Sequence, residues 1–296
     1  MRNPFLKIHL LIEGRNIRLP LTIIFYNAIL AFIMILFLVF NAETYQEGYY
    51  YDTFSYLQQF LLLSSIQIAA VFLLMPFFVS GLYVSDRENC MIEQFAMIPR
   101  VNRQFVQAKI SLVLLTNGLL FLSGIPIIGL ACVYTGLSWL KLIRLGLMVL
   151  LFSFWSGAVA VFFYSVYTRL VWSFAGTLFA QLAFLVGTII VIELFRNGAL
   201  VLSKDSMIPA EVSWICLFLL AMNPLSAFMG YYGNITGDNE LVSIYCSHFG
   251  VDASGRLFSL LFYKVSCLAC ILTGVIFLAL AVKYMNKNSA FDLTHS

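Results

Sequence analysis

The chain has 296 residues, of which 61% are hydrophobic and only 10% are charged, and its mean hydropathy is +0.93. Soluble domains are roughly half apolar and about a quarter charged. So few charges cannot cover the apolar surface, and lipid must therefore be the solvent for much of this chain. The net charge of +3 is too small to indicate nucleic acid, and we expect no nucleic-acid partner.

The first 18 residues precede the first long apolar segment. Within them Phe5, Ile8, Leu11 and Ile12 recur at helical spacing, while the basic residues lie off that stripe. This pattern predicts an amphipathic helix over 1–18 that lies on the inner membrane surface. A short helical lead-in without a mechanical role would give the same pattern.

Apolar segments long enough to cross a bilayer then follow one another along the chain. A spanning helix needs about 20 apolar residues, and six segments meet this length: 19–40, 54–84, 105–134, 143–167, 171–195 and 257–284. The sequence therefore predicts an all-α polytopic membrane protein, a single transmembrane domain over 1–296 with six transmembrane helices.

A seventh apolar stretch, 212–232, is interrupted near its middle by Asn223-Pro224, and proline breaks a helix. The stretch could cross the membrane or dip in and return. The distribution of Lys and Arg favours the second reading, because cytoplasmic loops are rich in these residues. A seventh span would place Lys283 and Lys287 outside. We therefore expect both termini in the cytoplasm and a re-entrant extracytoplasmic hairpin between the fifth and sixth spans.

The predicted inner loop between the second and third spans, 85–99, is the most informative segment. Charges at 86–88 border the second span, a short apolar stretch around Ile92 and Phe95 follows, and Pro99 ends it. Ile92 and Phe95 can share one helix face, and a proline would end that helix. The pattern is typical of a short helix on the cytoplasmic surface that offers side chains to another protein, or of a solvated loop.

This loop resembles the one after the second span in ABC type 2 permeases, the membrane subunits of one class of ATP-binding-cassette exporters. That family typically has two glutamates around a Gly-Thr pair, then apolar residues, a proline and basic residues. The matching positions here are Glu88, Glu93, Pro99, Arg103 and Lys109, and Cys90 and Met91 stand where the family has Gly-Thr. Asn223-Pro224 also resembles an Asn-Pro pair that family members often carry between their last two spans.

The resemblance implies that 85–99 is a coupling helix that docks on a separate ABC ATPase subunit. Two ATPase copies would serve two permeases, namely this chain and a second copy or a paralogue, surrounded by membrane lipid. The chain would move a hydrophobic or amphipathic substrate, such as a drug, a peptide or a lipid-like molecule, across the plasma membrane of a bacterial cell. The implied docking residues are Asp86, Arg87, Glu88, Ile92, Glu93, Phe95, Pro99 and Arg103, and Asn223 and Pro224 would form an extracytoplasmic gate.

Polar residues inside the predicted spans are few. Asn27, Gln67 and Gln181 either form hydrogen bonds between helices or line a translocation path. The sequence contains no phosphate-loop motif and no His-Glu-x-x-His motif. We therefore expect no enzyme activity, no catalytic or metal-binding residue and no cofactor on this chain, with ATP and Mg on the partner ATPase.

Two alternatives to an exporter subunit remain open from the sequence. The chain could be a membrane scaffold or sensor that uses the inner loop to hold a cytoplasmic partner without transporting anything. It could also be an ion-coupled carrier, although such carriers usually place carboxylates or arginines within the spans.

Overall fold

The computed structural model of the chain describes residues 6–7, 10–11, 17–46, 53–88, 101–167, 169–202, 215, 218–236 and 256–295. These residues form helices and short turns and contain no strand. Six of their helical segments are long and apolar enough to cross a membrane. The prediction of an all-α, multi-pass membrane protein is thereby confirmed. Most of the predicted 1–18 helix lies outside the described residues.

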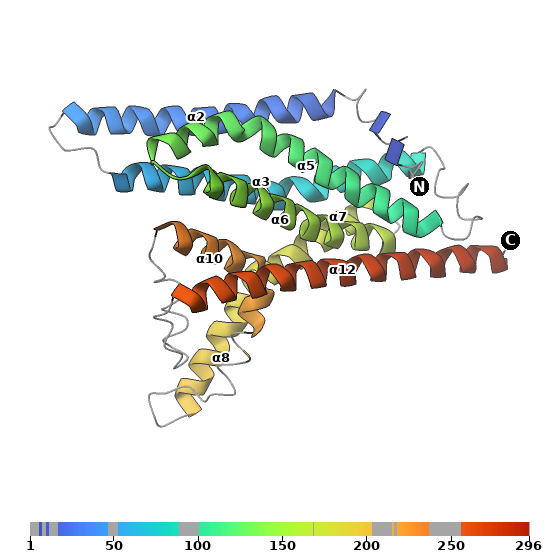
Figure 1. Cartoon of the computed structure of the whole chain (residues 1–296). Coiled ribbons are helices and arrows are strands. Elements are labelled where there is room, and N and C mark those ends of the chain that lie inside the picture. The colour runs from blue at the N-terminus through green and yellow to red at the C-terminus, as the bar shows by residue number, and fades with distance from the viewer. Residues whose placement is uncertain are drawn as a thin grey trace. The chain divides into compact units, whose positions relative to one another are not determined.

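The candidate spanning segments overlap the predicted ones, and their bounds differ from the predicted bounds by at most six residues. They are Leu19–Val39, Leu57–Gly81, Asn102–Tyr134, Trp139–Val166, Leu170–Phe195 and Tyr263–Met285. The helices that contain them are α2 (Arg18–Gln46), α3 (Thr53–Glu88), α5 (Val101–Tyr134), α6 (Trp139–Val166), α7 (Leu170–Leu182) with α8 (Thr188–Leu202), and α12 (Arg256–His295) (Figure 1). A π-helical turn, η1 (Ala183–Gly187), joins α7 to α8, and α10 (Pro224–Thr236) precedes α12.

The described helices belong to two compact units. The first comprises Met1–Phe174 and Leu278–Ser296, and the second comprises Ala175–Phe277. In the first unit α6 packs against both α3 and α5, and it is the most buried of the spanning helices. In an 18-residue apolar window of α6, 72% of the residues are buried, whereas only 17% are buried in the corresponding window of α2. The first unit therefore has a well-packed interior and a peripheral helix, α2, whose apolar side chains are mostly exposed.

Helices α5 and α6 form a tight hairpin in the first unit. The turn between them uses Gly136, whose φ of 66° is in the left-handed region that glycine adopts without strain. Gly136 N donates to Val133 O and Leu137 N donates to Cys132 O, both at 3.1 Å, which is the Schellman pattern that ends a helix. The two helices then pack closely, because Gly146 leaves room for the ring of Phe121.

A narrow stripe attaches α2 to this bundle. Tyr26, Leu30 and Met34 lie at four-residue spacing and are buried, so they share one face of the helix. A Cβ at Gly124 of α5 would lie 3.2 Å from Leu30 and 3.3 Å from Tyr26. Small residues allow such close approach between membrane helices, and Gly124 therefore permits α2 to pack directly on α5.

The second unit contains the interruption predicted at Asn223-Pro224. Residues 218–222 are helical, Asn223 is not, and α10 begins at Pro224. Proline is well tolerated at the first position of a helix, where its missing N–H has no intrahelical acceptor. Gly230 of α10 lies close to Tyr263 of α12, so α10 packs against the start of the last span.

Candidate functional site

The predicted docking segment is only partly described. Helix α3 continues to Glu88, so the first residues of the 85–99 segment, Asp86, Arg87 and Glu88 among them, extend the second spanning helix. Arg103 lies in the first turn of α5 and its side chain is exposed. The positions Ile92, Glu93, Phe95 and Pro99 lie outside the described residues.

A buried lysine stands where α3 and α5 meet beside that segment. Lys109 is 0% exposed, and its Nζ lies 5.3 Å from the ring centre of Tyr83 and 5.2 Å from that of Phe105. Tyr83 meets Phe105 edge to face at 6.0 Å and stacks on Tyr164 of α6 at 5.4 Å. A desolvated cation over an aromatic ring contributes about 2 kcal/mol. We call Tyr83, Phe105, Lys109 and Tyr164 the lysine cluster.

The lysine cluster connects three helices at one end of the bundle. Tyr83 lies near the end of α3, Phe105 and Lys109 near the start of α5, and Tyr164 near the end of α6. The segment 89–100 joins α3 to α5. A force on the segment 89–100 would therefore act on α3 and α5, which pack against each other and against α6. The sequence indicated Lys109 only as one of the positions that match the permease motif, and its position four residues after Phe105 was the available sign of a shared face.

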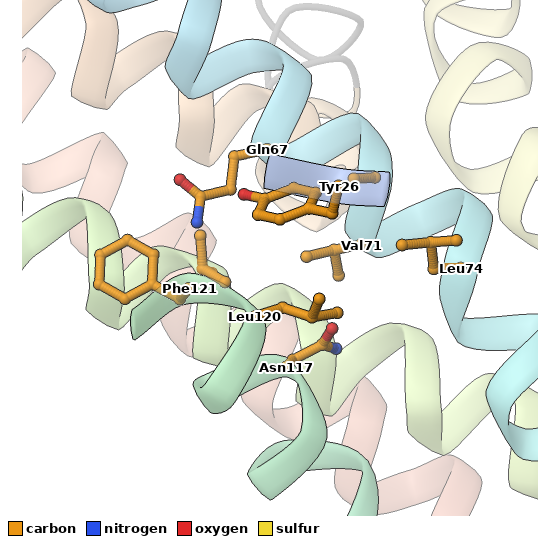
Figure 2. Close-up of a pocket in the computed structure, with 9 residues that line it drawn as sticks. Tyr26, Gln67, Val71, Leu74, Asn117, Leu120 and Phe121 are labelled. Carbon is orange, nitrogen blue, oxygen red and sulfur yellow. The ribbon is translucent and has the colours of Figure 1, made fainter. Parts of the chain in front are cut away.

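Two of the three predicted path-lining residues belong to the first unit. The Nδ2 of Asn27 donates to Ile23 O at 2.9 Å and to Ser123 Oγ at 3.0 Å, and so links α2 to α5. Gln67 of α3 is buried and lines a small cavity together with Tyr26 and Asn117 (Figure 2). The third residue, Gln181, lies on α7 in the second unit, where its side chain is buried.

Asn117 forms hydrogen bonds between helices, which is one of the two roles that the sequence left open for Asn27, Gln67 and Gln181. Its Nδ2 donates to Ser153 Oγ at 2.8 Å and lies 3.0 Å from the Met75 sulfur. Ser153 in turn donates to Val149 O within α6. One asparagine of α5 thus contacts both α3 and α6, as is common in membrane bundles, where small and polar residues hold helices together.

The side chain of the predicted gate residue Asn223 makes three hydrogen bonds within the second unit. Its Nδ2 donates to Leu185 O at 3.0 Å and to Thr188 Oγ1 at 2.8 Å, and its Oδ1 accepts from Leu225 N at 2.8 Å. The last bond makes Asn223 the N-cap of α10. The other two reach the π-helical turn η1 and the start of α8. Asn223 therefore ties the helix break before α10 to an irregular turn of the fifth span, and π-turns occur frequently at functional sites.

Among the described residues, no group of His, Cys, Asp and Glu side chains could hold a metal ion. Comparison of the chain with protein-family models, curated proteins and solved structures finds no match. The resemblance to ABC type 2 permeases therefore stays a prediction from sequence.

Proposed function

We propose that this chain is the membrane-spanning permease subunit of an ATP-driven exporter, with ATP hydrolysis on a separate chain. The observation that carries the proposal is the lysine cluster. Force applied to the 89–100 segment by a partner would reach α3 and α5 together, because Tyr83 of α3 lies against both Lys109 and Phe105 of α5. A transmitter of mechanical work needs such a joint between the docking segment and the spans.

Buried polar residues support this reading over a scaffold. A scaffold would use them for helix packing alone, whereas a permease can also use them to line a path. Here Gln59, Gln67, Asn117 and Asn223 are all buried. Buried polar residues at membrane depth are costly and usually serve packing or transport.

The proposed arrangement pairs this chain with a second copy or a paralogue, above two ATPase subunits. The chain itself carries no phosphate loop, so ATP and Mg would bind to the ATPases. Exposed Leu, Ile and Phe side chains of α2, among them Leu21, Phe25 and Phe32, suit a hydrophobic or amphipathic cargo that enters from lipid. Asn223 and Pro224 are the proposed extracytoplasmic gate.

The decisive experiment is purification of the tagged chain and identification of the proteins that come with it. A co-purified phosphate-loop ATPase, with ATP hydrolysis that depends on this chain, is the expected result. A cytoplasmic partner without a phosphate loop would instead indicate a scaffold. Uptake driven by an ion gradient without ATP would indicate a carrier, and either outcome would overturn the proposal.

Charge reversal in the predicted docking segment tests whether this segment contacts the ATPase. Glu88→Arg combined with Glu93→Arg should lower the amount of co-purified ATPase at least tenfold, because both carboxylates are expected to pair with basic groups of the ATPase. The matched control is Glu240→Arg, the same change at a position expected on the opposite side of the membrane. Equal recovery of ATPase with the parent chain, the Glu88→Arg/Glu93→Arg variant and the Glu240→Arg control would contradict the assignment of residues 85–99 as the docking segment.

A further inference from the structure

A small cavity lies inside the first unit where α2, α3, α5 and α6 meet (Figure 2). Its polar lining consists of Tyr26, Gln67 and Asn117, and the remaining lining is apolar, with Val71 and Leu120 among it. The cavity has room for about one water molecule. No charged side chain lines it.

The polar atoms at this cavity are buried without hydrogen-bond partners among the described residues. Both Nε2 and Oε1 of Gln67 lack a partner, and so does the hydroxyl of Tyr26. Gln67 is 2% exposed and Tyr26 is 7% exposed. In Figure 2 the amide of Gln67 and the hydroxyl of Tyr26 lie at the same side of the cavity. Asn117 differs, because its Nδ2 already contacts Ser153 and Met75.

An unpartnered polar group inside a membrane bundle is costly, since no bulk water reaches it. The amide of Gln67 offers two N–H donors and a carbonyl acceptor, and the phenol of Tyr26 can donate and accept. The missing partner must therefore donate and accept hydrogen bonds, carry no charge and be about as large as a water molecule.

We propose that this cavity binds one water molecule, which bridges the Tyr26 hydroxyl of α2 to the Gln67 amide of α3. Helix α2 is joined to α5 directly, through Asn27 with Ser123 and through the close packing at Gly124. Its direct polar contact with α3 lies further along the helix, where Gln59 Nε2 donates to the Met34 sulfur at 2.7 Å, and the water adds a second polar link at Tyr26. The inference does not depend on the proposed exporter function, because it concerns only the interior of the first unit.

Radiolytic footprinting tests the presence of the water in the full chain in detergent. Brief X-ray exposure generates hydroxyl radicals from bound water, so side chains beside such a water become oxidised although bulk solvent does not reach them. We expect oxidation at Val71 and Leu120, which are buried at the cavity. The matched control positions are Val159 and Leu145, buried side chains of the same types that do not line the cavity.

The outcomes are exclusive. Oxidation of Val71 and Leu120 above Val159 and Leu145, which falls to the control level in the Tyr26→Phe/Gln67→Leu double variant, supports the proposal. Oxidation equal to that of the controls in the unmodified chain overturns it. Oxidation that persists unchanged in the double variant also overturns it, because these side chains would then not hold the water.

A double-mutant cycle on the same two residues gives an independent readout. Tyr26→Phe and Gln67→Leu should each raise the unfolding equilibrium constant, since each leaves the water short of one partner. The double variant should be at least about threefold more stable than the product of the two single effects predicts. The control pair Ser123→Ala with Gln67→Leu should combine without coupling. Additive effects at Tyr26 and Gln67, or single variants that are more stable than the parent, would overturn the proposal that a water bridges these two side chains.

Coupling without radiolytic labelling would count against the proposal as well. That combination would mean that the Tyr26 hydroxyl and the Gln67 amide bond to each other directly once the chain is in detergent. The two measurements together therefore separate a bridging water from a direct side-chain contact.

Discussion

Replacement of Asn223 by leucine would remove all three hydrogen bonds of this side chain while keeping its approximate size. The side chain donates to Leu185 O and Thr188 Oγ1 and accepts from Leu225 N. Thr188 would keep one bond, because its own hydroxyl donates to Phe184 O at 2.8 Å. The carbonyl of Leu185 and the N–H of Leu225 would each lose a partner.

The expected cost follows from the two roles of the asparagine. Loss of an N-cap costs about 1 kcal/mol, and interhelical hydrogen bonds in membrane proteins average about 0.6 kcal/mol each. With one cap and two such bonds, Asn223→Leu should lower the free energy of unfolding by about 2 kcal/mol. Asn223→Ser keeps a hydroxyl that can cap α10 but is too short to reach η1, so it should cost about half as much.

Reversible unfolding in mixed micelles with increasing SDS would measure these differences. Thr188→Val is the matched control, because it removes one acceptor and leaves Asn223 bonded to Leu185 O and Leu225 N; it should cost less than about 1 kcal/mol. If Asn223→Leu were no more destabilising than Thr188→Val, the hydrogen bonds of Asn223 would not stabilise the second unit, and our reasoning would be refuted.

Two further predictions concern the first unit. Lys109→Met removes the cation that lies over the rings of Tyr83 and Phe105. The variant should bind the ATPase within about twofold of the parent but transport cargo at least tenfold more slowly. Unchanged transport in reconstituted vesicles would contradict the role of the lysine cluster. Gly146→Ala should lower the free energy of unfolding by about 1–3 kcal/mol, because its Cβ would lie 2.7 Å from Phe121. Gly118→Ala, where the nearest atom would be 3.9 Å away, should be neutral or slightly stabilising; equal effects in SDS unfolding would contradict the packing argument.

The spans were predictable from sequence because hydropathy is a local property of a segment. A window of about 20 apolar residues identifies a membrane helix whatever it packs against, and each predicted span corresponds to a described helix. The break at Asn223-Pro224 was predictable for the same reason, since proline acts on its own helix. The docking segment, the gate and the orientation of the termini remain predictions.

The contacts between helices could not be predicted. Burial of Lys109 depends on Tyr83, which is 26 residues away, and a basic residue near a span end is ordinarily read as a solvated or lipid-facing charge. The π-helical turn Ala183–Gly187 leaves no sign in an uninterrupted apolar sequence. The cavity at Gln67 arises from helices that meet only in the folded unit. Each of these features depends on how helices pack and not on the composition of one segment.

The Schellman turn at Gly136 has a consequence for how the protein is made. Residues 101–166 form two long helices joined by a turn of only four residues, so closing this hairpin costs little chain entropy. Contacts between neighbouring segments also form faster than distant ones. We therefore expect α5 and α6 to enter the bilayer as a preformed pair and to serve as the template on which α3, and finally the loosely attached α2, assemble.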